Sequence, residues 1–184
     1  MRSRCADEGW RRQPAPAVSA DELVDVVDDS DQALGTATRA QVRVGNLLHR
    51  ACYIIALDGR GRVFVHLRTA TKDVFPSHYD VTVGGVLAAG ETYDDAARRE
   101  VEEELGALPR RLRVVGSLRY EGAGTRVIGR IYDCRVDPPL RLQPEEIVSG
   151  EWLAVDEIER RLAASPFCPD GVVAFEEWRR VRRT

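Results

Sequence analysis

The amino-acid sequence predicts an α/β fold in which helices cover a mixed β-sheet. Three observations carry this prediction. Several short segments are rich in β-branched residues and alternate in polarity, one well-capped helix interrupts them, and two helices end the chain. The expected order is one short strand and then β–β–β–α–β–β–β–α–α, which suits a sheet with helices packed on it.

The N-terminal part is expected to contribute little regular structure. Residues 1–20 carry prolines and charges of both signs, and we expect them to form a flexible tail. A short strand is expected at Glu22–Val27, and Thr36–Arg43 is either a helical turn or an extended linker. Because the chain has 184 residues and no internal repeat, we expect residues 21–184 to form a single domain.

The expected strands are marked by alternation and by turn residues. The segment Asp58-Gly59-Arg60-Gly61 is a hairpin signal between two of them. The strands are expected at Ala51–Leu57, Arg62–Arg68, Tyr79–Val83, Leu112–Arg119, Arg126–Arg135 and Ile147–Leu153.

A helix is expected between Tyr93 and Leu105. Thr92 is its candidate N-cap, Asp95 lies three residues further on, and Gly106 is suited to end it. Two further helices are expected at Glu157–Ala164, with Asp156 as the cap, and at Gly171–Arg182, with Val172, Phe175 and Trp178 pointing inward.

Three carboxylates lie on one face of the central helix. Glu100, Glu103 and Glu104 have the spacing i, i+3 and i+4, and they fall near the negative end of the helix dipole. Their mutual repulsion predicts a compensating cation. Hard divalent ions such as Mg²⁺ bind carboxylate oxygens and keep room for substrate phosphates, so we expect a metal site that handles phosphate. Gly85, in the preceding glycine loop, is expected to offer its carbonyl as a further ligand.

These glutamates belong to a longer pattern that starts at Gly85 and ends at Ala107. The pattern is Gly-x5-Glu-x7-Arg-Glu-U-x-Glu-Glu-x-Gly-U, where U is an aliphatic or small apolar residue, and every defined position is filled. On this pattern the chain is identified as a member of the Nudix family. A solvated acidic helix is the alternative interpretation. The positions are Gly85, Glu91, Arg99, Glu100, Val101, Glu103, Glu104, Gly106 and Ala107.

The resemblance implies an α/β/α sandwich and a hydrolase that acts on phosphoric anhydride bonds. Its substrate would be a nucleoside diphosphate linked to another moiety, or a similar diphosphate. Glu103 and Glu104 would bind Mg²⁺ or Mn²⁺, and Glu100 would bind metal or accept a proton from the attacking water. Arg99 and Glu91 would form a salt bridge that holds the loop against the helix. Positioning and electrostatics would then carry most of the catalysis.

A second resemblance concerns the segment before the glycine loop. Leu48-His49-Arg50-Ala51, followed by Arg68 and Lys72, resembles isopentenyl diphosphate isomerase, a relative with the same fold. There the matching Arg and Lys hold the substrate diphosphate, so Arg68 and Lys72 are expected to bind substrate here; two solvated surface cations are the alternative. The isomerase cysteine and metal-binding histidine have no counterpart in residues 79–86, which argues against isomerase activity.

Two other residues are assigned by position. Glu145 and Glu146 precede a late strand, where many Nudix proteins place a metal-binding carboxylate, and Glu146 is favoured; a charged turn after Pro144 is the alternative. His66 shares a strand face with Phe64 and Arg68, and we favour a packed histidine over one that lines a pocket.

Composition limits the remaining classes. A net charge of −3 gives no bulk attraction to nucleic acid polymers or anionic membranes. Four scattered cysteines form no Cys-x-x-Cys pair, and no signal peptide or long apolar run is seen, so a cytoplasmic location is expected. A homodimer is common in the family, but the sequence identifies no interface. Three functions remain: a metal-dependent pyrophosphohydrolase, an isomerase-like enzyme, and a non-catalytic ligand-binding Nudix domain.

Overall fold

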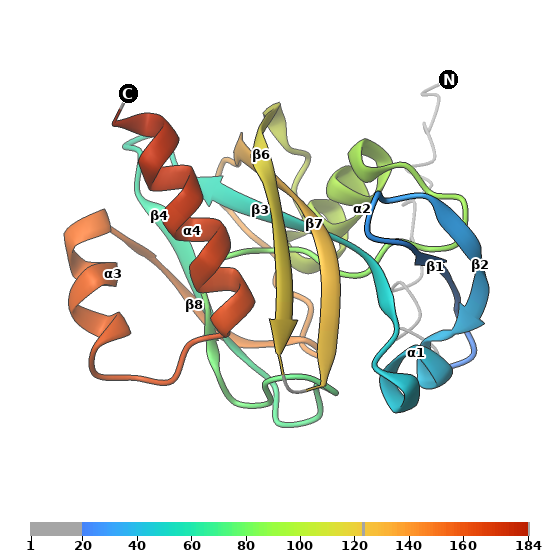
Figure 1. Cartoon of the computed structure of the whole chain (residues 1–184). Coiled ribbons are helices and arrows are strands. Elements are labelled where there is room, and N and C mark those ends of the chain that lie inside the picture. The colour runs from blue at the N-terminus through green and yellow to red at the C-terminus, as the bar shows by residue number, and fades with distance from the viewer. Residues whose placement is uncertain (1–19, 123, 184) are drawn as a thin grey trace, which may run out of the picture.

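The computed structural model of the chain describes residues 20–122 and 124–183, so nearly all of the expected tail, residues 1–20, lies outside the described residues. Figure 1 shows the arrangement of the elements. The strands are β1 (Leu23–Val27), β2 (Ala33–Thr38), β3 (Leu48–Leu57), β4 (Val63–Arg68), β5 (Tyr79–Asp80), β6 (Arg110–Gly122), β7 (Thr125–Arg135) and β8 (Ile147–Leu153). The helices are α1 (Arg39–Gly45), α2 (Tyr93–Leu105), α3 (Val155–Leu162) and α4 (Pro169–Arg182).

The strands form one mixed, eight-stranded sheet that divides at a hairpin. β3 and β4 pair only at Leu57 and Val63, next to the turn. Beyond this point β3 runs parallel to β7, which pairs with β6, and it also meets β1 of the β1–β2 hairpin. β4 instead pairs with β5 and β8. The two groups of strands therefore separate, and loops can enter between them.

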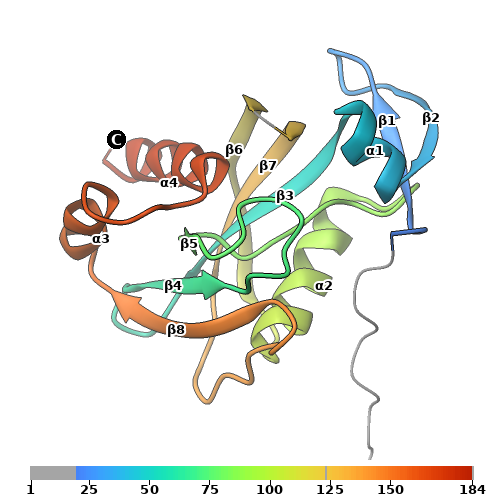
Figure 2. The same cartoon turned by 90° about the horizontal axis from the view of Figure 1, so that it is seen from below.

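Helices cover both sides of the sheet, as the α/β/α sandwich requires. Figure 2 shows α2 on one side and α3 with α4 on the other. The α2 side buries a core that includes Ile54, Val101 and Tyr132. The other side buries Phe175 and Trp178 of α4 with Ile158 of α3. Each large apolar side chain buried in this way contributes about 1.5–3 kcal/mol, so both layers are needed.

The limits of α2 agree with the prediction. The Thr92 side chain accepts a hydrogen bond from the Asp95 backbone N–H, and Gly106 ends the helix with φ of 61° in the left-handed region. These two caps set where α2 begins and ends, and therefore which of its turns carry the glutamates. The position of the acidic face in the fold is therefore set locally.

The two C-terminal helices begin earlier than expected. α3 is capped at Ala154, so the prediction of Asp156 as its cap is wrong. The Glu157 carboxylate accepts from the Ala154 backbone N–H at 3.0 Å, which replaces a side-chain cap on Ala154. α4 starts at Pro169, since proline tolerates the first helical position.

Two further predictions agree only in part. Of the helical turn or linker expected at Thr36–Arg43, the helical alternative is met by α1, which Thr38 caps with a reciprocal bond to Gln41, whereas β2 before it was not expected. The expected strand at Tyr79–Val83 is reduced to β5 and single bridges. The backbone turns at Gly84, where φ is 146°, and this ends regular pairing.

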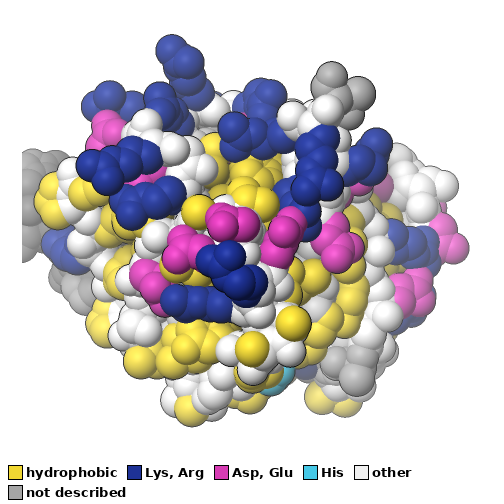
Figure 3. Space-filling view, turned by 90° about the vertical axis from the view of Figure 1, so that its left-hand side faces the viewer, with side chains coloured by type: hydrophobic (Ala, Val, Ile, Leu, Met, Phe, Trp, Pro, Cys, Tyr) yellow, Lys and Arg dark blue, Asp and Glu magenta, His cyan; other side chains and the backbone are white. Residues whose placement is uncertain are grey.

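Charges of both signs cover the end of the molecule formed by α3, α4 and β8 (Figure 3). Ion pairs join Glu159 to Arg179 and Arg161 to Glu151. This face therefore mixes the two signs instead of presenting a basic surface. Among the helices within residues 20–122 and 124–183, none is long and apolar enough to cross a membrane.

Candidate active site

The glutamates of α2 differ in their exposure. Glu100 is 8 % exposed and Glu104 is 3 % exposed, because both point toward the sheet. Glu103 is partly buried at the edge, whereas Glu102 faces solvent. A carboxylate is rarely buried without a partner, so the inner pair calls for compensating charge.

Burial is the main cause of the unusual electrostatics of these two groups. It raises the pKa of Glu100 and of Glu104 above the ordinary range, and the nearby carboxylate of Glu146 raises both further. Arg99 opposes the shift at Glu100, while Lys72 and Arg68 oppose it at Glu104. Three carboxylates from two elements therefore lie within electrostatic reach of one another.

Arg99 connects the glycine loop to the acidic face. Its guanidinium donates to both oxygens of Glu91 at 2.9 Å, as the sequence predicts. It also contacts Glu100 at 2.8 Å and Glu103 at 3.2 Å, which the sequence analysis did not anticipate. Arg99 is therefore a shared counter-charge for three carboxylates, in addition to a clamp on the loop.

The backbone at Gly84 and Gly85 forms the wall beside the glutamates. The Gly84 N–H donates to Glu104 Oε1 at 3.3 Å. A Cβ at Gly85 would lie 2.6 Å from Glu100 Oε1, so only glycine fits there. The Gly85 carbonyl accepts hydrogen bonds from the Cys52 N–H at 2.9 Å and from the Cys52 thiol at 3.7 Å, so a further ligand at this oxygen would have to replace the weaker thiol contact.

Glu146 reaches the same region from the turn before β8. Its carboxylate pairs with Lys72 Nζ at 2.6 Å, and both side chains are mostly buried. Two further bonds tie this turn to the loop after β4, from Thr69 N to the carbonyl of Glu146 and from Thr69 Oγ1 to that of Glu145. The structure therefore brings Lys72 and Glu146 together, although the sequence assigned them to substrate and metal separately.

The Arg68 side chain is mostly buried, so it is not a solvated surface cation. Its guanidinium lies 3.5 Å from Asp80 and donates to the Val74 carbonyl at 3.0 Å. Burial is the largest single influence and lowers the pKa of Arg68, but Asp80 together with Cys168, Glu104 and Asp170 outweighs it, and the pKa is raised. Arg68 therefore remains charged at neutral pH and helps to hold the loop that carries Lys72.

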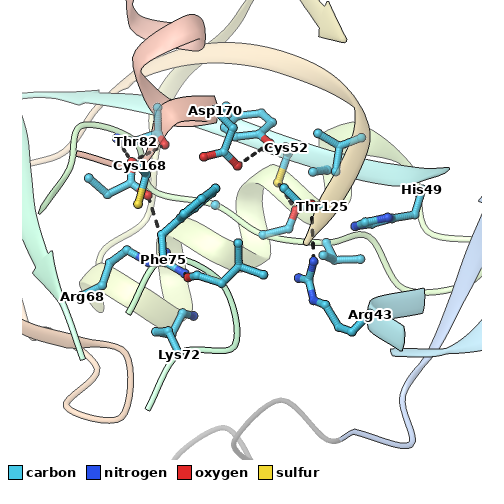
Figure 4. Close-up of a pocket in the computed structure, with 18 of the residues that line it drawn as sticks. Arg43, His49, Cys52, Arg68, Lys72, Phe75, Thr82, Thr125, Cys168 and Asp170 are labelled. Carbon is cyan, nitrogen blue, oxygen red and sulfur yellow. Dashed lines mark hydrogen bonds and ion pairs between the residues drawn. The ribbon is translucent and has the colours of Figure 1, made fainter. Parts of the chain in front are cut away.

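A pocket lies on the other side of the Gly84–Gly85 wall (Figure 4). Arg68, Lys72 and Phe75 lie at one side of it in this view, and Arg43 and His49 lie at the other. The sequence analysis did not anticipate several residues that line it, because they come from elements far apart in the chain. These include Arg39, Arg43, Tyr53, Asp80, Thr82, Thr125 and Asp170.

The other residues considered in the sequence analysis are buried or border the hydrophobic core. His66 is 2 % exposed and stacks on Phe64 with a centroid separation of 6.1 Å, so the interpretation as a packed histidine is confirmed. Trp152 packs edge-on against the same Phe64 ring and borders the core. Cys52 lines the pocket but is 1 % exposed, and burial raises the pKa of its thiol strongly.

Comparison with known proteins identifies the family. The model of the NUDIX domain matches residues 47–170. The chain belongs to the Nudix family. An uncharacterized Nudix hydrolase of Streptomyces coelicolor is 47 % identical over 163 residues, covering 88 % of this chain and 90 % of its own. The Nudix hydrolase YfcD of Escherichia coli is 37 % identical over 161 residues, covering 88 % of each chain. The protein is therefore a Nudix hydrolase that acts on pyrophosphate bonds.

Solved Nudix structures agree with the fold. A crystal structure of a Deinococcus radiodurans protein, DR0079, superposes with a TM-score of 0.71 at 27 % identity, covering 88 % of this chain and 98 % of that one. The NUDIX domain of Shewanella oneidensis NrtR, solved with ADP-ribose, gives a TM-score of 0.59 at 13 % identity, covering 73 % and 88 %. At that identity the likeness concerns the fold alone.

The donors in this Nudix hydrolase fit a hard divalent cation. Glu100, Glu104 and Glu146 offer oxygen atoms, which Mg²⁺ and Mn²⁺ prefer, and their burial disfavours three negative charges without a cation. Within residues 20–122 and 124–183, no three acidic, histidine or cysteine side chains are arranged to hold a metal ion. Arg99 and Lys72 pair with carboxylates that a metal would need, so these side chains would have to rearrange when it binds.

Proposed function

We propose that this Nudix hydrolase cleaves the P–O–P bond of a small diphosphate compound with Mg²⁺ or Mn²⁺. Glu100, Glu103, Glu104 and Glu146 would hold the metal, with the Gly85 carbonyl as an additional ligand. One observation supports this most strongly: the buried carboxylates of α2 and the cationic pair of the loop after β4 meet at the Gly84–Gly85 wall. Negative groups for a cation and positive groups for phosphates thus lie next to each other.

Arg68 and Lys72 would bind the diphosphate. Both line the pocket, and Arg68 is fixed by Asp80 and by the Val74 carbonyl, so its guanidinium is oriented in advance. Lys72 is held by Glu146 at 2.6 Å. Its ammonium has three N–H donors, so it can keep this contact while another N–H reaches a phosphate oxygen. The second oxygen of Glu146 would stay available to the metal.

The α2 residues would carry the chemistry. A bound divalent metal lowers the pKa of its water and neutralises phosphate charge. Glu100, whose pKa is raised mainly by burial, is suited to accept a proton from the attacking water near neutral pH. Arg99 is a positioning residue, because its bonds to Glu91, Glu100 and Glu103 hold these carboxylates in place.

The two alternative functions have less support. An isomerase of the isopentenyl diphosphate type needs an acid–base group across the carbon skeleton. Cys52 lines the pocket, but its burial and raised thiol pKa make it a poor candidate. We propose that the likeness at residues 48–72 reflects a shared way of holding a diphosphate. A non-catalytic role is disfavoured because every carboxylate of the motif is present.

The test is an assay with Mg²⁺ over a panel of diphosphates. ADP-ribose belongs to the panel because the NrtR Nudix domain was solved with it, together with NADH, nucleotide sugars, dinucleoside polyphosphates and prenyl diphosphates. We expect metal-dependent hydrolysis that is lost in Glu104→Gln and kept in Glu102→Gln, a solvent-facing glutamate of the same helix. Double-bond migration without phosphate release, or tight binding without turnover, would contradict the proposal.

A further inference from the structure

Two arginines of α1 face the pocket without a carboxylate partner. Arg39 and Arg43 are four residues apart on α1, so they share a face and repel one another. Neither forms an ion pair within residues 20–122 and 124–183. Other partly buried arginines have ion pairs, although the buried Nε atoms of Arg68 and Arg179 also lack an acceptor within the described residues. Arg50 pairs with two aspartates and Arg68 pairs with Asp80.

The side-chain bonding of Arg43 is incomplete. Its Nη1 donates to Thr125 Oγ1 at 3.4 Å, which is a long contact, and its buried Nε has no acceptor in the described part of the chain. Burial lowers the pKa of this guanidinium, and the neighbouring charge of Arg39 lowers it further; Asp73 and Asp170 oppose this shift but do not outweigh it. The positive charge is therefore poorly compensated, and an anion would relieve this.

Asp80 and Asp170 also line the pocket, but within the described residues no carboxylate lies within ion-pair distance of Arg43. His49 is 1 % exposed, and its Nδ1 must donate to the Leu47 carbonyl at 2.8 Å, so Nε2 carries a lone pair. Within the described residues this Nε2 has no partner and is closed to solvent. Burial lowers the pKa of His49 to about 4, which keeps the ring neutral. A buried acceptor and a buried donor are thus left unpaired on the same side of the pocket.

Arg43 and the diphosphate-binding pair lie apart. In Figure 4, Arg43, His49 and Thr125 lie at one side of the pocket, and Arg68, Lys72 and Phe75 lie at the other. α1 also precedes the part of the chain that matches the NUDIX domain, residues 47–170. A group bound by Arg43 would therefore be a different part of the ligand from its diphosphate.

We propose that Arg43, with Arg39 beside it, binds a second oxyanion of the substrate. This oxyanion is a phosphate monoester or a carboxylate on the group attached to the diphosphate. Arginine suits both, because its planar guanidinium donates to two oxygens at once. The inference rests on the proposed function for the diphosphate, but the anion site itself can be tested without turnover.

The first experiment observes arginine Nε–H signals by NMR in the metal-free wild-type protein. Inorganic phosphate is titrated in, then sodium acetate, with sodium chloride keeping the ionic strength constant. The Arg43 signal is assigned by its absence from Arg43→Lys. We expect it to shift and to saturate at millimolar phosphate, and saturation by acetate as well would add carboxylates to the class. A signal that never saturates with either anion would overturn the inference.

The second experiment compares diphosphates that differ by one remote phosphate. The pairs are NADP with NAD and coenzyme A with dephospho-coenzyme A. We expect the wild-type protein to favour the phosphorylated member of at least one pair by about tenfold in KM. Arg43→Gln should reduce that preference at least fivefold, whereas Arg60→Gln, an exposed arginine outside the pocket, should keep it. The same preference in both variants would count against the role of Arg43.

The two proposals can fail separately. If no diphosphate is hydrolysed with metal, the proposed function fails while the phosphate titration still decides the anion site. If diphosphates are hydrolysed but Arg43 neither responds to anions nor affects preference, only the anion site is refuted.

Discussion

The acidic face of α2 and the basic face of α1 each bring like charges close together, but the two faces differ in how those charges are compensated. On α2, Glu100 and Glu103 share Arg99, and Glu146 nearby holds Lys72, so much of the negative charge is compensated within the protein, although the buried Glu104 has no ion pair in the described residues. On α1, Arg43 has only a long bond to Thr125 within the same part of the chain. Charge that is compensated internally can stay folded without a ligand, whereas charge that is left unpaired in a pocket indicates a ligand.

The largest effect should come from the acidic face. Glu103→Gln removes one negative charge from a partly exposed site, so the fold should persist. Loss of a metal ligand should weaken Mn²⁺ binding and reduce turnover by roughly a hundredfold or more. Mn²⁺ electron paramagnetic resonance and steady-state kinetics measure both, with Glu102→Gln as the control. Wild-type rates and Mn²⁺ affinity in Glu103→Gln would refute the assigned role.

A smaller effect is expected at Arg68, which lines the pocket and holds the loop after β4 through the Val74 carbonyl. Arg68→Ala should raise KM for diphosphates about tenfold, in line with the loss of a charge-assisted hydrogen bond worth about 1.5–3 kcal/mol. Because Asp80 would lose its partner, the free energy of unfolding should also fall, by about 1–3 kcal/mol. Kinetics and urea denaturation measure the two changes, and Arg68→Lys should recover part of each. An unchanged KM would mean that Arg68 only supports the loop.

The smallest effect on activity is expected from the two buried, neutral histidines, which should change the free energy of unfolding instead. Burial lowers the pKa of His49 and of His66 to about 4, from an ordinary value of 6.5. The unfolded chain therefore binds protons first on acidification. The stabilisation is complete above pH 6.5 and is lost as the pH falls toward 4. At 1.36 kcal/mol per pKa unit, the difference between 6.5 and about 4 gives each histidine about 3 kcal/mol of this loss.

Urea denaturation between pH 7 and 4.5 checks this prediction. The double variant His49→Asn with His66→Phe should lose most of the slope in that interval. If the double variant keeps the slope of the wild-type protein, other groups determine the acid sensitivity.

Local signals were predictable from the sequence, and pairings between distant segments were not. Thr92 and Gly106 fix α2 from its neighbours alone, so its limits agreed with the structure. β2 was missed because it is an exposed edge strand, and such a strand has no buried face to produce alternation. The parallel pairing of β3 with β7 has no local signal either.

The same distinction applies to the candidate site. The carboxylates of α2 are close in sequence, so their shared face follows from helical spacing. Arg43 and Thr125 are 82 residues apart and meet only because β7 is parallel to β3. Similarly, the ion pair of Lys72 with Glu146 joins residues that the sequence assigned to different ligands. No pattern within one segment could have indicated these contacts.

The ion pair of Lys72 with Glu146 has a consequence for the order of events. The pair is mostly buried and neutral as a whole, so a metal bound at Glu146 alone adds positive charge there, and a diphosphate bound at Lys72 alone adds negative charge. When both are bound, each offsets the charge that the other brings. The protein should therefore bind metal and substrate cooperatively, each strengthening the binding of the other.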